Sequence, residues 1–188
     1  MTAESKDALR RRIRQLKKSQ PAAELFCQSA AGLALLQQHP RWQAARTVCL
    51  YWALPDEVQT RALCFAAMKE KTVLLPVVQG EDLVLRRFEW EAQLRNDNPL
   101  HIFEPCGADW TDLQAVDLVV VPGVAFDSSG RRLGRGRGFY DRFLPKLRAF
   151  RMGLCFSFQY LDNLPAGPED IPMDEVIVCP PSPPQSHA

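Results

Sequence analysis

The segment VDLVVVP, residues 116–122, carries the clearest strand signal in the chain. Its apolar residues follow one another without alternation, which is typical of a parallel strand covered by helices on both faces. Short apolar runs and helical stretches alternate around it, and this order indicates an α/β fold. Ligands of such sheets bind beyond the carboxyl ends of the strands. The residues that follow Pro122 are therefore the first candidates for a site.

Upstream of this strand we expect two helices and then strands that alternate with a helix. An apolar stripe predicts a first helix over residues 2–18, with Thr2 or Ser5 as its cap. A second helix opens at Pro21 and ends near Pro40. The elements expected next are a strand over 47–53, a helix over 58–71, and two strands over 72–78 and 82–88 joined by a turn.

Downstream we expect a helix over 139–150, a strand over 152–157 and a last strand over 175–178. The length of 188 residues is close to that of one domain, and the sequence has no internal repeat. We therefore expect a single domain over 1–180, folded as a three-layer α/β/α sandwich with a mostly parallel central sheet, Rossmann-like. The Pro-rich residues 181–188 are expected to form a solvated tail.

The composition is that of an ordinary globular protein, with 46% hydrophobic residues, 24% charged residues and a formal net charge of +1. This charge argues against nucleic acid or a membrane as a partner of the whole molecule. The polar N-terminus carries no apolar segment, so we expect neither a signal peptide nor a membrane span, and a cytoplasmic location. The six cysteines form no CxxC pair and are expected to be buried, reduced thiols. We expect a monomer.

A glycine- and arginine-rich loop, GRRLGRGRGFYD at residues 130–141, follows the clearest strand and precedes an expected helix. Its glycines let the backbone take dihedral angles closed to other residues and let its amides approach a ligand. The start of the helix adds partial positive charge. The arginines among these glycines are Arg131, Arg132, Arg135 and Arg137. The loop therefore predicts a cradle for a compact anion such as a polyphosphate or a carboxylate.

The loop fits neither of two common nucleotide-binding patterns. A P-loop requires Gly-Lys followed by Ser or Thr, and the dinucleotide fingerprint requires GxGxxG early in the chain. Taken alone, the glycine string could equally belong to an exposed loop without a ligand. Asp141, in the first turn of the expected helix, has two interpretations. It either offsets the helix dipole or holds Mg²⁺ beside the phosphates of a nucleotide.

A longer pattern runs through this region and beyond it. Its residues are Pro122, Phe126, Asp127, Arg132, Leu133, Gly134, Gly136, Gly138, Phe139, Tyr140 and Asp141. Shorter segments belong to the same pattern in chain order: Lys6 to Arg10, 55–58, 75–76, 104–105 and 174–176. With these residues the chain resembles the 5-formyltetrahydrofolate cyclo-ligase family, the methenyltetrahydrofolate synthetases, over almost its whole length.

The resemblance implies a fold of the sugar isomerase/CoA transferase type. It also implies a reaction that uses ATP and Mg²⁺ to convert 5-formyltetrahydrofolate into 5,10-methenyltetrahydrofolate, with release of ADP and phosphate. The implied partners are thus ATP and a folate. Phosphoryl transfer to the formyl oxygen would activate the carbon that the second folate nitrogen attacks. Positioning and neutralisation of charge would supply most of the catalysis.

The resemblance further implies roles for individual residues. Arg137 and Tyr140 are the expected catalytic residues. ATP is expected to contact Lys6, Arg10, Arg132, Leu133, Gly134, Arg135, Gly136, Arg137, Gly138, Phe139, Tyr140 and Asp141. Folate is expected to contact Trp52, Glu57, Arg135, Gly136, Arg137, Gly138 and Phe139. Magnesium is expected to be held by Asp141 and Asp174.

Several of these residues also have plainer structural interpretations. Lys6 and Arg10, four residues apart on the first helix, fit a solvated basic face as well as a phosphate contact. Glu57 fits a helix cap, and Trp52 fits a place in the core. The residues alone do not decide between these interpretations and a site.

The chain also departs from the commonest family pattern. Arginines occupy both positions 135 and 137, Phe139 stands where Tyr is frequent, and Glu169-Asp170 stands where many relatives have His-Asp. Two other functions therefore stay open. One is an enzyme of the same fold that uses ATP on another formylated or heterocyclic substrate. The other is a non-catalytic protein that binds folate, a nucleotide or, through the basic helix at 6–18, RNA.

Overall fold

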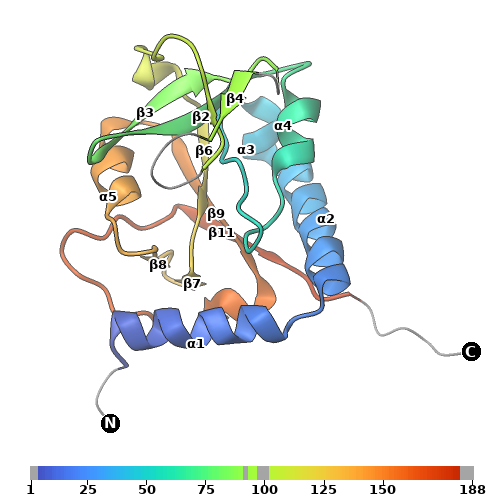
Figure 1. The fold of residues 1–188 in the computed structure, drawn as a ribbon, viewed down its shortest axis with the longest axis vertical. Coiled ribbons are helices and arrows are strands. Elements are labelled where there is room, and N and C mark those ends of the chain that lie inside the picture. Colours follow the sequence, from blue (N-terminus) through green and yellow to red (C-terminus); the bar gives the residue numbers. More distant parts are fainter. Residues whose placement is uncertain (1–3, 91–92, 97–101, 183–188) are drawn as a thin grey trace, which may run out of the picture.

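The computed structural model describes residues 4–90, 93–96 and 102–182, and its centre is a six-stranded sheet (Figure 1). The strands follow the order β11-β9-β6-β1-β2-β3. Every neighbouring pair is parallel except β2 and β3, which form an antiparallel hairpin. These strands are β1 (Thr47–Cys49), β2 (Thr72–Gln79), β3 (Asp82–Arg87), β6 (Leu118–Pro122), β9 (Phe150–Phe156) and β11 (Glu175–Cys179).

Helices and two smaller sheets surround this central sheet. The α-helices are α1 (Lys6–Ser19), α2 (Ala22–Gln38), α3 (Pro40–Ala44), α4 (Arg61–Ala67) and α5 (Phe139–Phe143). Short 3-10 helices are η2 (Leu113–Ala115), η3 (Leu144–Lys146) and η4 (Ser157–Gln159). The smaller sheets consist of β7 (Ala125–Asp127), β8 (Arg132–Leu133) and β10 (Tyr160–Leu161), and of β4 (Leu94–Arg95) with β5 (Glu104–Pro105).

The alternation of side chains along β6 shows why three layers form. Leu118 and Val120 pack in a buried cluster with residues of α2, α3 and α4. Val119 and Val121 point to the other face and pack with α5 and η3. All four side chains are fully buried, so an uninterrupted apolar run is what this strand requires. The three-layer sandwich with a mostly parallel sheet is therefore confirmed.

The connections leave the middle of the sheet in opposite directions. From β1 the chain crosses to β2 on one side, and it later returns to β6 on the other side of β1. The parallel strands thus follow the chain order 2-1-3-4-5, which is the flavodoxin-like doubly wound arrangement. The point between β1 and β6 is the topological switch point, where the carboxyl ends of two strands open a crevice for a ligand.

The first helix lies apart from the other helices, close to β7 and β8 (Figure 1). Leu9 and Ile13 on its inner face pack against Leu133 of β8 and other buried residues of this region. The side chain of Ser5 accepts a hydrogen bond from the backbone N–H of Ala8, so Ser5 is the cap. The alternative cap, Thr2, lies outside the described residues. This helix supports the glycine-rich loop from below.

Two helices differ from the sequence prediction because of proline residues. The helix expected over 139–150 ends at Phe143 and continues only as η3. Pro145 has no N–H to donate to the carbonyl of Asp141, so the α-helical pattern stops. Pro40, expected to end the second helix, also opens α3, because a missing N–H is harmless in a first turn.

The cysteines agree only in part with the expected buried, reduced thiols. The six cysteines are free, and four of them are buried: Cys49, Cys64, Cys155 and Cys179. Burial raises the pKa of Cys64 and Cys179 to about 12, so these thiols stay protonated at neutral pH. Cys27 is exposed and Cys106 is half-buried, so the expectation of burial was wrong for these two cysteines. Within the described ranges, none of the helices has the length and apolar character needed to cross a membrane.

Candidate active site

A cavity of about 350 Å³ lies at the switch point between β1 and β6. Its lining comes from the residues that follow β1, from the β2–β3 hairpin, from residues 102–104, and from the segment between Pro122 and Asp141. Doubly wound sheets place their ligand sites here, and sites for small molecules typically measure about 300–1,000 Å³. Position and size both identify this cavity as the candidate active site.

Part of the cavity lining is aromatic, contributed by Tyr51, Trp52, Phe103, Phe139 and Tyr140. The Trp52 side chain is almost fully buried, yet its indole N–H finds no hydrogen-bond partner among the described residues. Buried donors nearly always have a partner, so this N–H is suited to a polar atom of a ligand. The aromatic part of the lining therefore favours a flat heterocycle.

The glycine-rich loop forms another part of the lining. Gly136 and Gly138 have φ angles of 100° and 68°, in a region that side chains disfavour. Gly138 directly precedes α5 and turns the chain into that helix. The Nε of Arg10 donates a hydrogen bond of 2.9 Å to the carbonyl of Gly134, so α1 holds the loop in place. The backbone geometry thus requires glycine where the sequence predicted a cradle.

Arg132 and Asp141 form an ion pair in the wall of the cavity. The Arg132 Nη2 lies 2.9 Å from the Asp141 Oδ1, and the arginine side chain is only 4% exposed. The guanidinium also lies over the ring of Tyr140, 5.3 Å from its centre. Its Nε is buried and has no partner in the described part of the chain. A nearly buried cation with an unused donor is well suited to an anionic ligand.

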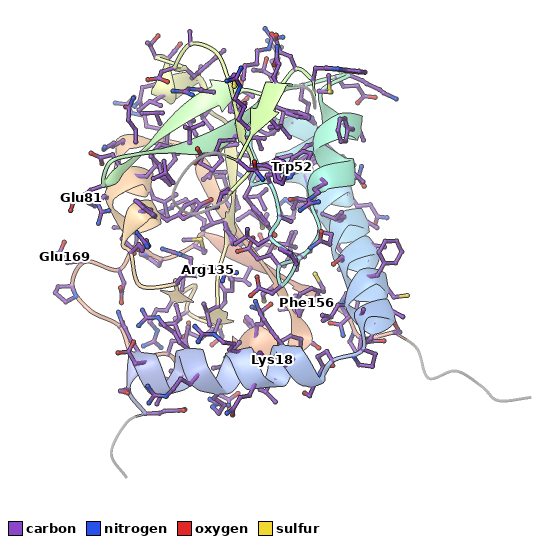
Figure 2. All side chains as sticks on the ribbon, in the orientation of Figure 1. Lys18, Trp52, Glu81, Arg135, Phe156 and Glu169 are labelled. Atoms are coloured by element: carbon purple, nitrogen blue, oxygen red, sulfur yellow. The ribbon has the colours of Figure 1, made fainter. Side chains whose placement is uncertain are left out.

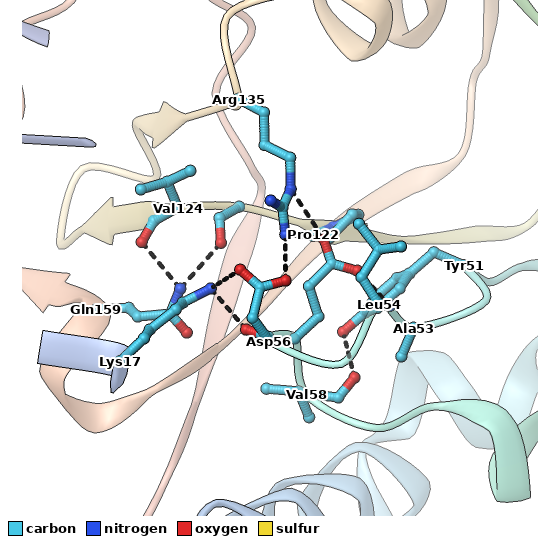
Figure 3. Close-up of polar contacts among 12 residues, drawn as sticks. Lys17, Tyr51, Ala53, Leu54, Asp56, Val58, Pro122, Val124, Arg135 and Gln159 are labelled. Carbon is cyan, nitrogen blue, oxygen red and sulfur yellow. Dashed lines mark hydrogen bonds and ion pairs between the residues drawn. The ribbon is translucent and has the colours of Figure 1, made fainter. Parts of the chain in front are cut away.

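Arg135 lies where the loop meets the segment that follows β1 (Figure 3). Its Nη2 is 2.6 Å from the Asp56 Oδ1 and 3.1 Å from the Glu57 Oε1. Burial works against its charge, but the carboxylates of Glu57 and Asp56 outweigh burial and raise the pKa of Arg135. Figure 2 shows Arg135 and Trp52 toward the middle of the molecule. Arg135 also lines a second, smaller cavity of about 60 Å³ beside α1.

Lys17 of α1 binds the other side of Asp56. Its Nζ donates to the backbone carbonyl of Asp56 at 2.7 Å and lies 3.4 Å from the Asp56 Oδ2. Burial lowers the pKa of Lys17, although the charge of Asp56 opposes this shift. Burial would raise the pKa of Asp56, but the charges of Lys17 and Arg135 outweigh it and lower that pKa. Asp56 therefore stays ionised between two cations.

Most residues with an expected role meet in this one cavity. Those that line it are Trp52, Glu57, Arg132, Arg135, Arg137, Gly138, Phe139, Tyr140 and Asp141. Leu133, Gly134 and Gly136 belong to the same loop, and Leu133 points into the cluster beneath α1. Burial raises the pKa of Tyr140 well above its ordinary value, so its hydroxyl stays protonated at neutral pH.

The two expected phosphate contacts on α1 lie outside the larger cavity. Arg10 lines the second cavity, next to Arg135. The Nζ of Lys6 is 2.5 Å from the Asp170 Oδ2, so this lysine is paired with the segment before β11. Lys6 is thus paired with Asp170 and does not line the larger cavity.

The two expected magnesium ligands are not brought together. Asp174 precedes β11 and binds Arg151, with its Oδ1 2.6 Å from the Arg151 Nη2. Its Oδ2 also accepts the backbone N–H of Arg151, near the amino end of β9. Asp141, in contrast, lies beyond the carboxyl end of β6 and lines the cavity. In the described part of the chain, no group of three or more metal-binding side chains occurs.

Sequence reasoning missed Asp56 and Lys17. Asp56 stands next to Glu57 in the segment PDEV, so its position in the family pattern could have indicated a place in the site. Lys17 is one of many basic residues on α1, and only the fold shows that its side chain is 8% exposed and aimed at Asp56. Basic residues on one helix cannot be ranked without knowing which side is covered.

Fold and site together define a doubly wound α/β protein whose cleft joins an aromatic cavity to a cationic glycine-rich loop. The sequence profile of the 5-formyltetrahydrofolate cyclo-ligase family matches residues 2–179. The chain belongs to the 5-formyltetrahydrofolate cyclo-ligase family, which is a family of ligases.

Individual relatives agree with this assignment. The chain is 35% identical to a probable 5-formyltetrahydrofolate cyclo-ligase of Schizosaccharomyces pombe, over 72% of each protein. It is 31% identical to the 5-formyltetrahydrofolate cyclo-ligase of Haemophilus influenzae, over 79% of this chain and 90% of that one. Its fold matches the 5,10-methenyltetrahydrofolate synthetase of Aquifex aeolicus with a TM-score of 0.83 and 32% identity, covering 92% of this chain and 89% of the other.

Proposed function

We propose that this protein catalyses the ATP- and Mg²⁺-dependent cyclisation of 5-formyltetrahydrofolate to 5,10-methenyltetrahydrofolate, with release of ADP and phosphate. One observation carries the proposal. A single cavity at the switch point combines an aromatic lining and a carboxylate, Glu57, with the arginines of a glycine-rich loop. Family membership supports the same reaction.

The aromatic part of the cavity would take the pterin ring of the folate. A pterin presents a ring N–H and an amino group side by side, and both donate hydrogen bonds. Glu57, whose side chain is 10% exposed, is a suitable acceptor for this pair of donors. The unpartnered indole N–H of Trp52 would donate to an acceptor atom of the substrate.

The loop would take the phosphates of ATP. Gly136 and Gly138 leave backbone amides accessible, and Arg132 and Arg137 line the cavity beside them. Arg10 and Lys6 would approach the phosphates from α1, Lys6 after leaving Asp170. Phosphoryl transfer relies on positioning and on neutralising negative charge, and this part of the chain supplies cations for both.

The oxygen atoms that the cavity offers fit a magnesium ion. Magnesium needs only one or two protein carboxylates, because phosphate oxygens and water complete its shell. Asp141 meets this requirement, since only one of its two oxygens is bound to Arg132. When bound, the ion would neutralise charge on the phosphates. Asp174 remains a predicted ligand that would have to leave Arg151 to take part.

The proposed reaction has two steps. The formyl oxygen attacks the γ-phosphorus, the bond from this phosphorus to the β-γ bridging oxygen breaks, and ADP leaves. The second nitrogen then attacks the formyl carbon, loses its proton, and phosphate departs to give the cyclic cation. Arg137 and Arg132 would stabilise charge on the transferred group. Tyr140, whose pKa burial raises further above neutral pH, would donate a hydrogen bond rather than accept a proton.

The proposal is tested by incubating the protein with 5-formyltetrahydrofolate, ATP and Mg²⁺ and following methenyl absorbance. We expect an absorbance rise that requires both ATP and Mg²⁺, with one ADP formed per product. ADP release with another heterocycle, but no absorbance rise with the folate, would assign a different substrate. Folate binding without ATP consumption would assign a non-catalytic role. The cytoplasmic location and the monomeric state remain predictions.

A further inference from the structure

Arg135 lies between Glu57, the carboxylate proposed to bind the pterin ring, and the glycine-rich loop proposed to bind phosphate. Its guanidinium donates to the Glu57 Oε1 from Nε at 3.3 Å and from Nη2 at 3.1 Å. Glu57 is the carboxylate assigned above to the pterin ring. Arg135 also belongs to the loop assigned above to phosphate. One side chain therefore contacts the proposed sites of both substrates.

A count of hydrogen bonds shows that Glu57 cannot serve both partners fully. A carboxylate accepts about four hydrogen bonds, two on each oxygen. Arg135 supplies two to Oε1, and the backbone N–H of Leu54 supplies one to Oε2 at 3.0 Å. About one acceptor site remains, whereas a pterin offers two adjacent donors. Binding of the ring to Glu57 thus requires Arg135 to give up at least one bond.

The released guanidinium would stay close to the loop. Asp56 holds it through a contact of 2.6 Å that does not involve Glu57. Lys17, in turn, fixes Asp56 through its backbone carbonyl (Figure 3). Arg135 is 48% exposed, so it can turn about this contact without disturbing the core. It already lines the second cavity together with Arg10, which would draw a phosphate group to this side.

We propose that Arg135 couples the two substrates: binding of the pterin ring to Glu57 releases Arg135 from this carboxylate, and Arg135 then binds the phosphates of ATP. This inference rests on the proposed function and concerns its regulation. Folate would then tighten the binding of ATP, and ATP would tighten the binding of folate by the same factor. The arrangement would also limit the use of ATP when no folate is present.

The test measures the dissociation constant of adenylyl imidodiphosphate with Mg²⁺ by calorimetry, with and without saturating 5-formyltetrahydrofolate. We expect the folate to tighten binding by about fivefold or more in the native protein. Arg135→Ala should reduce this factor to less than about twofold. Arg137→Ala is the matched control, because it removes an arginine of the same loop that also lines the cavity. Arg137→Ala should weaken the binding of the ATP analogue but leave the folate-induced tightening unchanged.

A second variant, Glu57→Gln, tests whether Glu57 holds Arg135 away from the phosphates of ATP. Glu57→Gln weakens the hold on Arg135, so without folate the ATP analogue should bind more tightly than to the native protein. In the Arg135→Ala background the same substitution should change little. An equal gain in both backgrounds would mean that Glu57 only repels the phosphates, and would overturn the inference.

The failures of the two proposals are distinguishable. If the native protein binds neither the ATP analogue nor the folate, the proposed function fails. If the native protein binds both, but Arg135→Ala keeps the full folate-induced tightening of the ATP analogue, only the coupling by Arg135 fails. Circular dichroism melting of each variant checks that the fold is retained.

Discussion

Two arginine–aspartate pairs lie at opposite ends of the parallel strands. Arg132 and Asp141 meet beyond the carboxyl end of β6, and the arginine is 4% exposed in the wall of the cavity. Arg151 and Asp174 meet beside the amino end of β9, and both are about one-third exposed. Their contact distances are similar, at 2.9 and 2.6 Å. The chemistry of a pair therefore does not reveal its use, whereas its place in a doubly wound sheet does.

The largest effect is expected from Arg132. Arg132→Met should lower kcat/KM by about 100-fold or more, because it removes a preorganised cation from the site of phosphoryl transfer. The rate of methenyl formation measures this loss. Arg151→Met is the matched control at the amino end and should stay within about threefold of the native rate. Similar losses in both variants would mean that the two pairs act only through folding.

Magnesium dependence separates the two aspartates. Asp141→Asn should raise the Mg²⁺ concentration needed for half-maximal rate by about tenfold, since it weakens a carboxylate ligand. A titration of the initial rate with Mg²⁺ measures this shift. Asp174→Asn should shift the titration less, because Asp174 is paired with Arg151 and lies outside the cavity. If Asp174→Asn shifts it as far as Asp141→Asn, both aspartates bind the ion and the Arg151 pair opens during turnover.

The smallest effect is expected on stability and depends on pH. Burial would raise the pKa of Asp174, but the hydrogen bonds and charge of Arg151 outweigh burial and lower it below its ordinary value. A lowered pKa stabilises the fold above the unfolded value, and the gain is lost as pH falls through the folded value. Asp174→Asn should therefore lower Tm at pH 7 by up to about 2–4 °C, which corresponds to about 1 kcal/mol.

The same comparison is repeated in acid. Once the pH is below the folded-state pKa of Asp174, this side chain is protonated in both states and the native protein should lose its advantage over Asp174→Asn. Melting curves at pH 7 and under acid conditions measure this convergence. A difference in Tm that persists unchanged in acid would show that packing, rather than the ion pair, makes Asp174 stabilising.

Much of the fold could be predicted because it depends on local patterns. The apolar run of β6 and the turn at Gly80 between β2 and β3 follow from hydrophobic spacing and turn chemistry, whereas the cap of α1 was predicted only as Thr2 or Ser5. The small strands β7, β8 and β10 were missed. They are two or three residues long; β7 and β8 pair with each other across a turn, and β10 pairs with a segment distant in sequence, as Tyr160 does with Phe126. Such pairs carry no periodic signal.

The sequence by itself determined the family pattern, the central strand and the glycine positions, because glycine and proline act on their own backbone. Only the tertiary structure decided which charges meet. Lys17 and Lys18 are adjacent and chemically identical, yet Lys17 is buried on Asp56 and Lys18 is exposed on α1 (Figure 2). Arg135 and Glu57 are 78 residues apart and share one ion pair. Contacts of this kind depend on how separate elements pack, which local residue patterns do not encode.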